Sequence, residues 1–194
     1  LALLPALLAW LLSVKAKWPA GRTFAAVYMV SGSLFFGISS IINKIQPPEI
    51  IVKKQTEYMQ LPVAATQIKL TPLQPTFKSF AANASEALNH SLLRPYLWEL
   101  PVSSLLPLCI ELFFYQLVFI LFIFFSRKNA NPADKPFLYF AIFLTLNIFL
   151  FIGYIVPNLG SLVRYRSLYL PFMITPLLCC VDWDRLAGYF KIKK

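Results

Sequence analysis

Two long apolar runs limit the fold of this chain more than any other feature. At about 1.5 Å per residue of α-helix, Ser104–Phe125 and Phe137–Val156 are each long enough to cross a hydrocarbon layer of about 30 Å. Of the 194 residues, 58% are hydrophobic and only 13% are charged, about half of the roughly 25% that is usual in a soluble domain. These observations exclude a water-soluble globule and predict an all-α, polytopic membrane helix bundle.

Run lengths and helix-breaking residues place the membrane helices at about 1–14, 23–42, 104–126, 137–157 and 162–182. The first run would form a helix only about 21 Å long. It also lacks the basic start and the cleavage site of a signal peptide. We therefore interpret it as a clipped helix, and the chain as the C-terminal part of a longer protein.

The expected organisation is four complete membrane helices and one partial helix. It divides into four segments: membrane helices at 1–42, an extracytoplasmic loop at 43–103, a three-helix membrane segment at 104–182 and a basic tail at 183–194.

Lysine and arginine concentrate in three of the connecting segments. These hold ten of the 18 basic residues, namely Lys15, Lys17, Arg22, Arg127, Lys128, Lys135, Arg185, Lys191, Lys193 and Lys194. The positive-inside rule makes these segments, including the C-terminus, cytoplasmic. The net charge of +10 then reflects topology and attraction to anionic lipid headgroups, worth about 1 kcal/mol per residue. Nucleic acid is not an expected partner, because no basic stripe interleaved with aromatic residues lies outside the membrane.

The residues that usually bind metals or perform covalent catalysis are sparse. Cys109, Cys179 and Cys180 fall in predicted membrane helices without a CxxC spacing, and His90 is the only histidine. The cysteines are expected to be packing residues. No metal site, cofactor or Ser-His-Asp triad is expected within this chain.

One ordered element is expected in the proline-rich segment 43–103. Apolar residues recur at helical spacing from Thr76 to Leu93, which predicts an amphipathic helix that lies on the membrane surface. Tyr96 and Trp98 follow it. This aromatic pair fits an interfacial anchor, and it equally fits a lid or wall over a cavity open to the outer face. Both interpretations stay open at the level of sequence.

Several polar residues fall inside the predicted membrane helices. Glu111 lies roughly 10 Å below the outer boundary, where an acidic group is costly unless it is paired, protonated or facing water. Tyr115 follows one turn later, and Asn147, Tyr154 and Asn158 share one stripe of the next helix. Two interpretations remain, a shared polar interior or hydrogen bonds that hold helices together.

Arg164 and Arg166 lie in a short connection predicted to be extracytoplasmic, against the usual charge bias. A guanidinium binds phosphate or carboxylate through two hydrogen bonds at once. The helix that follows adds free N–H groups at its start. The pair therefore predicts an anion site at the outer surface or, alternatively, structural arginines. A helix that begins near Leu159 would require both to snorkel, pair with Glu111 or hold a ligand.

These residues also carry a family resemblance. The pattern Asn158-x-Gly160-Ser161-x-x-Arg164-Tyr165-Arg166-x-x-x-x-Pro171, together with Arg94-Pro95-Tyr96-x-Trp98-Glu99 and Glu111, resembles bacterial polytopic inner-membrane proteins of surface-polysaccharide synthesis. These include O-antigen-polymerase-like proteins and glycosyltransferases that use polyprenyl-phosphate-linked sugars. The resemblance covers about residues 70–182. The chain departs from it at Ser161, where threonine is usual, and at Leu168, where proline is usual.

The resemblance implies a protein of the bacterial cytoplasmic membrane that handles polyprenyl-phosphate-linked glycans at the outer leaflet. Arg164 and Arg166 would grip the phosphate with Arg94 as a third contact, and the supporting polar residues would be Asn158, Ser161 and Tyr165. In the related glycosyltransferases the catalytic carboxylate belongs to an earlier extracytoplasmic loop. Glu111 is therefore only a secondary catalytic candidate.

Three classes of function follow. The first is a membrane enzyme of glycan transfer or polymerisation, in which the arginines neutralise a phosphate leaving group. The second is a transporter or flippase of an anionic lipid, in which Glu111 forms an intramembrane pair with an arginine. The third is a non-catalytic subunit or scaffold that meets membrane protein partners.

Overall fold

A computed structural model describes residues 2–41, 46–62, 66–96, 106–127 and 135–190. Within these ranges the chain forms eight α-helices and no β-strand. The helices are α1 (Leu3–Lys15), α2 (Ala20–Ile41), α3 (Pro47–Met59), α4 (Phe77–Leu92), α5 (Leu106–Phe125), α6 (Lys135–Ile155), α7 (Leu159–Cys179) and α8 (Trp183–Phe190). The all-helical fold class is confirmed.

Three elements differ from the sequence-based expectation. The helix expected from 162 begins at Leu159 and continues through Pro171 and Pro176, so the arginine pair lies within α7 and not in a loop. α3 falls in the segment expected to be irregular, because prolines at its first two positions start a helix that they would interrupt elsewhere. α8 falls in the segment expected to be a tail.

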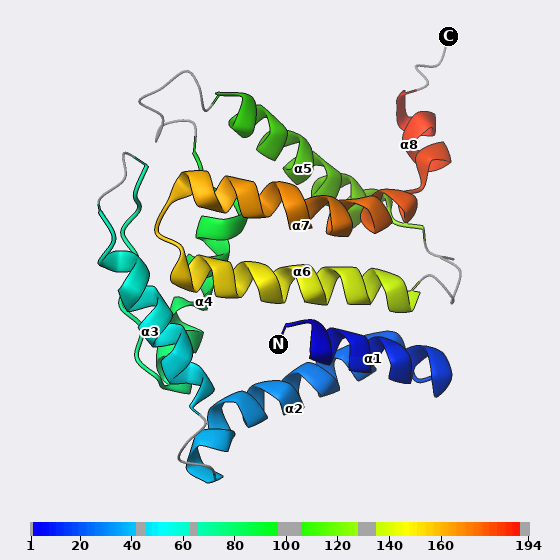
Figure 1. Ribbon diagram of the computed structural model, residues 1–194. Helices are drawn as coiled ribbons and strands as arrows, with labels where there is room; N and C mark the ends of the chain where they lie inside the picture. Colours follow the sequence, from blue (N-terminus) through cyan, green and yellow to red (C-terminus); the bar gives the residue numbers. More distant parts are fainter. Residues whose placement is uncertain (1, 42–45, 63–65, 97–105, 128–134, 191–194) are drawn as a thin grey trace.

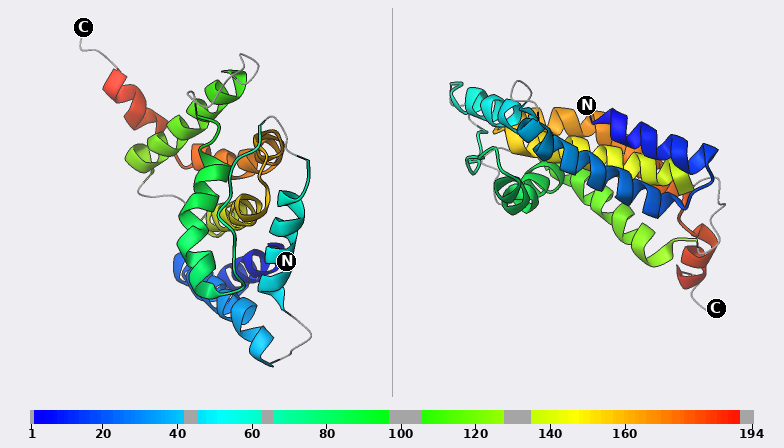
Figure 2. Two further views of the ribbon diagram at one scale, coloured as in Figure 1. Left: turned by 90° about the vertical axis from the view of Figure 1, so that its left-hand side faces the viewer. Right: turned by 90° about the horizontal axis from the view of Figure 1, so that it is seen from below.

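α6 lies at the centre of the molecule, with α1 and α2 on one side of it and α7 followed by α5 on the other (Figure 1). α4 runs across α6 and α7 near one end of this layer, and α3 packs against α6 at the same end (Figure 2). We call this the α3/α4 end. The α1–α2 turn, the start of α6 and helix α8 lie at the opposite end, which we call the α8 end (Figure 1).

The separation of the two ends agrees with the expected charge pattern. Lys15 and Lys17 at the α1–α2 turn, Lys135 at the start of α6 and Arg185 in α8 belong to the α8 end (Figure 1). Residues 128 and 191–194, which carry further predicted cytoplasmic lysines, lie outside the described residues. The described basic segments that were assigned to one side of a membrane therefore lie at one end of the helix layer.

The contact between α4 and α6 depends on a glycine. A Cβ atom added at Gly153 would lie 1.9 Å from the carbonyl oxygen of Ala87, so only glycine permits this approach. Beside it, Phe80 of α4 packs edge-on against the ring of Tyr154, with ring centroids 5.1 Å apart. Phe35 of α2 contacts the same Phe80 ring at 6.1 Å. The contact thereby joins α2, α4 and α6 in one hydrophobic cluster.

α5 is attached more simply. Its inner face packs on α7 through side chains that include Val118, Phe119 and Phe122. Its C-terminal end is joined to the connection between α7 and α8 by a backbone pairing in which Asp182 N–H donates to the carbonyl of Phe125 at 2.7 Å. The rest of its surface is mostly exposed.

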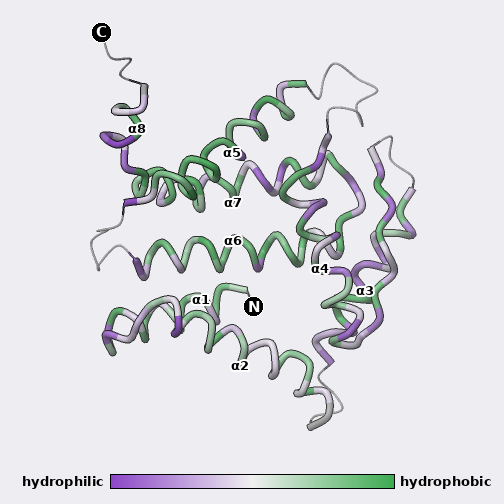
Figure 3. The backbone as a smooth tube through the Cα atoms, turned by 180° about the vertical axis from the view of Figure 1, so that it is seen from behind, coloured by the Kyte–Doolittle hydropathy of each residue, from purple (hydrophilic) through white to green (hydrophobic). Residues whose placement is uncertain are grey.

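Two of the helices, α5 and α6, are long and apolar enough to cross a membrane, with mean hydropathies of 2.4 and 2.2 over their most apolar windows. Both are predominantly hydrophobic along their length in Figure 3. α1 is apolar but shorter, and α2 and α7 are less apolar on average and are not among the candidate spans found in the described residues. The serines and glycines of α2 and the two arginines of α7 lower their averages. The four-span bundle is therefore not confirmed.

Candidate functional site

The C-terminal end of α4 meets α5 and α7, and this junction contains most of the polar residues singled out from the sequence. α4 begins at Thr76, whose side chain accepts a hydrogen bond from the N–H of Ser79. The helix ends at Leu92. The last carbonyls of a helix have no partner within it, so the end of α4 needs donors from elsewhere in the fold.

Arg166 of α7 provides those donors. Its side chain is buried, with 4% exposure, and its Nε donates to the carbonyl of Ser91 at 3.0 Å. Its Nη2 donates to the carbonyl of Arg94. A cation at a helix C-terminus also interacts favourably with the helix dipole. Arg166 is therefore a C-terminal cap for α4 supplied by another helix, and two of its donor groups are already used.

Glu111 and its neighbours complete this junction on the α5 side. Tyr115 Oη donates to Glu111 Oε1 at 2.8 Å, and Cys109 Sγ contacts the carbonyl oxygen of Pro95 at 3.5 Å. The Glu111 carboxylate is close enough to Arg166 for their charges to attract, although the two do not form a direct ion pair. The hydrogen bond from Tyr115 thus holds the Glu111 carboxylate at a distance where it still attracts the Arg166 guanidinium.

Arg164 has a different environment from Arg166. The two residues are separated by about 200° around the helix axis, so Arg164 projects to the exposed side of α7. Its guanidinium carbon lies 5.7 Å from the centre of the Tyr165 ring, in a cation–π contact. Because they lie on different faces, Arg164 and Arg166 do not form one shared guanidinium site.

Asn158 caps the start of α7. Its Oδ1 accepts from the N–H of Gly160 at 2.9 Å and from Thr66 Oγ1 at 3.0 Å. The backbone on both sides is paired with the segment after α3, since Leu159 N–H donates to the carbonyl of Thr66 at 3.0 Å. Ser161 lies half-buried in the first turn. Asn158 therefore fixes where α7 begins.

Arg94 and Tyr96 lie directly after α4. Arg94 is half-buried, and its guanidinium carbon lies 5.9 Å from the centre of the Tyr96 ring. Tyr96 Oη donates to Asn89 Oδ1 at 2.5 Å. Trp98 and Glu99 lie outside the described residues. The part of this segment that can be described folds back onto α4.

The expected stripe on α6 does not form a shared polar interior with Glu111. Tyr154 Oη donates to the carbonyl of Phe80 at 2.6 Å, while Asn158 caps α7 and Glu111 bonds within α5. Tyr154, Asn158 and Glu111 therefore serve three separate contacts. For Tyr154 and Asn158, the second of the two earlier interpretations applies: their hydrogen bonds hold neighbouring elements together.

Sequence reasoning missed Gln55 in α3, which is 3% exposed. Its Nε2 donates to the carbonyl of Tyr154 at 2.8 Å and to that of Thr71 at 3.2 Å, and its Oε1 accepts from Leu73 N–H at 2.8 Å. The neighbouring pocket, which Asn83 also lines, has room for about one water molecule. It is too small for a sugar. No sequence pattern marks Gln55 as buried, because it is one glutamine in a helix of average polarity.

Nothing in the described residues gathers the ligands of a metal site, since they contain no cluster of three or more histidine, cysteine, aspartate or glutamate side chains. No protein-family model, curated protein or solved structure matches the chain. The function must therefore be argued from the geometry of the chain itself.

Proposed function

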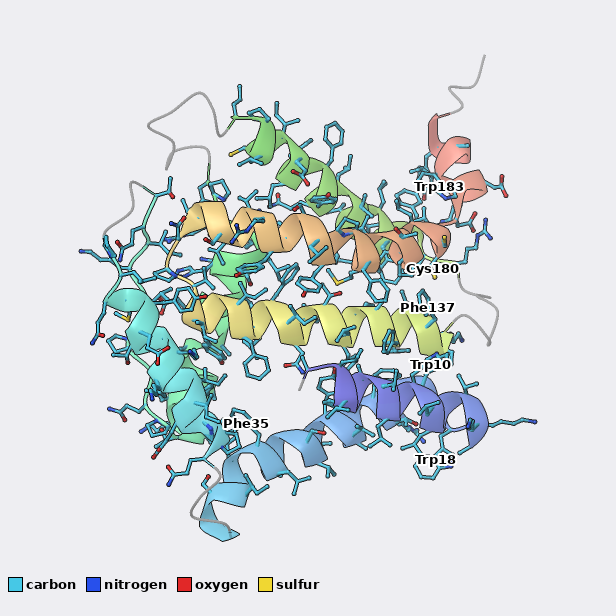
Figure 4. The ribbon with its side chains drawn as sticks, viewed as in Figure 1. Trp10, Trp18, Phe35, Phe137, Cys180 and Trp183 are labelled. Atoms are coloured by element: carbon cyan, nitrogen blue, oxygen red, sulfur yellow. The ribbon has the colours of Figure 1, made fainter. Side chains whose placement is uncertain are left out.

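We propose that this chain is the membrane-embedded part of a protein that handles polyprenyl-phosphate-linked glycans at the outer leaflet, in glycan transfer or polymerisation. The layer formed by α1, α2, α5, α6 and α7 would cross the membrane, with the α8 end cytoplasmic. The basic residues of the α8 end support this orientation. So do the exposed Trp18 and Trp183, which lie at that end (Figure 4), as expected of an aromatic belt.

The observation that carries the proposal is the position of Arg164. It is an exposed guanidinium on the second turn of α7, at the α3/α4 end, which the proposed orientation places at the outer leaflet. At about 1.5 Å per residue, it lies less than 10 Å from the start of the helix, at the depth of lipid phosphates. A guanidinium suits phosphate because it offers paired donors in one plane.

The other predicted residues take supporting roles in this proposal. Arg166 holds the end of α4 beside the site, Asn158 fixes the start of α7, and Arg94 supplies a second cation near the membrane surface. Glu111 is already bonded to Tyr115. The base or nucleophile of a transfer reaction is then expected outside these residues.

Native mass spectrometry of the protein in detergent tests the proposal. A co-purified polyprenyl phosphate should be retained by the unmodified protein and reduced about tenfold by Arg164→Ala. Arg164→Lys should give an intermediate loss, because charge is kept while the two-donor geometry is lost. Arg185→Ala is the matched control, since it removes an exposed arginine at the opposite end. Equal lipid retention by all four proteins would refute a phosphate site at Arg164.

A non-catalytic subunit or scaffold is the second candidate. One observation favours a scaffold. The side chains of Arg166, Asn158 and Gln55 already form hydrogen bonds that hold α3, α4 and α7 in place. A scaffold should tolerate Arg164→Lys in a cell-surface glycan assay. A glycan enzyme should lose turnover.

A further inference from the structure

Gln116 occupies an unusual position in α5. It lies near the middle of this helix, roughly 15 Å from either end, and its side chain is exposed. Within the described part of the chain, no hydrogen-bond partner is found for its carboxamide. If α5 spans a membrane, Gln116 would face the centre of the hydrocarbon layer, too deep for its short side chain to reach the headgroups.

An unpaired carboxamide at that depth is costly, because lipid tails offer neither donors nor acceptors. Polar side chains in membrane helices are commonly satisfied by a neighbouring helix. Gln116 is exposed, and no described helix covers it: α5 packs mainly on α7, contacts α8 near its C-terminal end, and meets the segment after α4 only near its N-terminal end, at Cys109. The missing partner must therefore come from outside the described chain.

The residues around Gln116 form a continuous exposed seam. Phe113, Gln116, Ile120 and Ile123 follow one another at spacings of three, four and three, the a and d positions of a heptad repeat. The apolar members are 63%, 50% and 68% exposed, in that order. α7 packs against a different face of α5, which includes Val118 and Phe122. The seam is therefore free to receive another helix.

We propose that this seam binds the same seam of a second copy of the chain, forming a two-fold symmetric dimer with the α5 helices parallel. A carboxamide carries both donors and an acceptor, so its partial charges complement those of an identical group. Two copies inserted with the same topology would place both Gln116 residues at the same depth, where a two-fold axis along the membrane normal lets each meet its counterpart. A single polar residue in such a seam also fixes the register.

This inference rests on the membrane placement in the proposed function, but not on Arg164 or on phosphate. The dimer would present two outer-leaflet sites side by side. Lipid alone, a helix of a different protein and a helix from another part of the proposed membrane protein are the competing occupants, and the experiment separates them from a second copy.

The first arm is disulfide cross-linking of the protein in native membranes. In a background with Cys109, Cys179 and Cys180 changed to alanine, single cysteines at Phe113, Ile120 and Ile123 should form disulfide-linked dimers on oxidation. Cysteines at Phe114 and Leu121 should not, because these positions lie away from the seam. Phe114 is the matched control, an adjacent phenylalanine with 58% exposure. Absent cross-links, or equal cross-linking at all five positions, would overturn the proposal.

The second arm measures dimer affinity by energy transfer between labelled copies in lipid bilayers. Gln116→Leu should weaken dimerisation about tenfold, which corresponds to about 1.4 kcal/mol, while Gln116→Asn should keep most of the affinity. Leucine removes a polar group from the exposed surface, so this variant is not expected to misfold. Unchanged affinity in Gln116→Leu would refute the role of the carboxamide.

The outcomes also separate this inference from the proposed function. Release of the protein from membranes by alkaline extraction would contradict both. A membrane-embedded protein that retains polyprenyl phosphate without Gln116-dependent dimerisation would refute the dimer alone. A dimer in a protein that retains no such lipid would leave the dimer standing and refute the glycan proposal.

Discussion

The junction of α4 with α6 and α7 is held very differently from helix α5. At the junction, a close backbone approach at Gly153, a hydrogen bond from Tyr154 and two from Arg166 fix α4 in one position. α5 meets its neighbours mainly through interchangeable apolar side chains. Directional contacts specify a geometry, whereas apolar contacts tolerate repacking. The two regions should therefore respond to substitution in different ways.

The largest effect is expected from Gly153→Ala. The added Cβ would collide with the Ala87 backbone, which cannot move without displacing α4. We expect the free energy of unfolding to fall by about 3 kcal/mol, measured by thermal unfolding in detergent. Gly37→Ala in α2 is the control, because nothing lies within 4 Å of its added Cβ. It should be neutral or stabilising by up to about 1 kcal/mol. Equal effects at both glycines would contradict the close approach.

Arg166→Leu is expected to have the next largest effect. It leaves the carbonyls of Ser91 and Arg94 without their donors, at a cost of about 2 kcal/mol. Arg164→Leu, two residues away on the exposed side, should change stability by less than about 0.5 kcal/mol. Proteolysis near residue 93 should report the loosened end of α4. A stable Arg166→Leu protein with α4 still protected would show that the cap is dispensable.

Tyr154→Phe removes a single hydrogen bond and keeps the ring packing with Phe80. The free energy of unfolding should fall by about 1 kcal/mol, measured by the same thermal unfolding assay. Tyr189→Phe in α8, where the side chain is 71% exposed, is the matched control and should have no measurable effect. A similar loss at both tyrosines would mean that the Tyr154 hydroxyl contributes nothing specific.

On α5, Phe124→Ala should lower stability by less than about 0.5 kcal/mol in detergent, because the ring is exposed and lies away from α7. Leu112→Ala on the buried face of the same helix should cost about 2 kcal/mol or more. This pair checks that α5 is held by one face only. A large loss at Phe124 would indicate that its surface is covered.

The smallest effect is expected at an exposed ion pair in α3. Lys54 Nζ donates to Glu57 Oε2 at 2.7 Å, and this hydrogen bond lowers the pKa of the Glu57 carboxyl. The pair therefore contributes above the carboxyl's ordinary pKa, and its contribution is lost as the pH falls through the lowered one. Glu57→Gln should shift the unfolding temperature by less than about 1 °C at neutral pH. The shift should vanish in acid or at high salt, and a larger one would mean that this pair is shielded from water.

Much of the helical architecture could be predicted because it depends on local patterns. Apolar runs located α2, α5 and α6, and periodic apolar residues located α4 to within a residue at each end. α3 carries no comparable signal, because its composition is near the polar average and prolines usually interrupt a helix. The start of α7 differs from the prediction for a related reason. Asn158 caps a helix that begins at Leu159, although the arginines that follow make its first turns polar.

The partners of the site residues could not be predicted in the same way. Arg166 has the positive charge expected of a phosphate-binding residue, but its hydrogen-bond acceptors are backbone carbonyls. Every residue has such a carbonyl, so no sequence pattern marks the ones that Arg166 will meet. Gln55 and Gly153 owe their roles to segments far away in the chain. Side-chain chemistry identified the unusual residues, whereas the fold decides what each one faces.

The cap that Arg166 gives to α4 also bears on how the protein is made. Arg166 and Ser91 are separated by 75 positions in the sequence, so α4 leaves the ribosome well before its capping residue has been synthesised. The end of α4 must stay hydrated or fray until α7 arrives. The C-terminal end of α4 is thus fixed late in biogenesis, and a nascent chain truncated before α7 would contain α4 without its hydrogen bonds from Arg166.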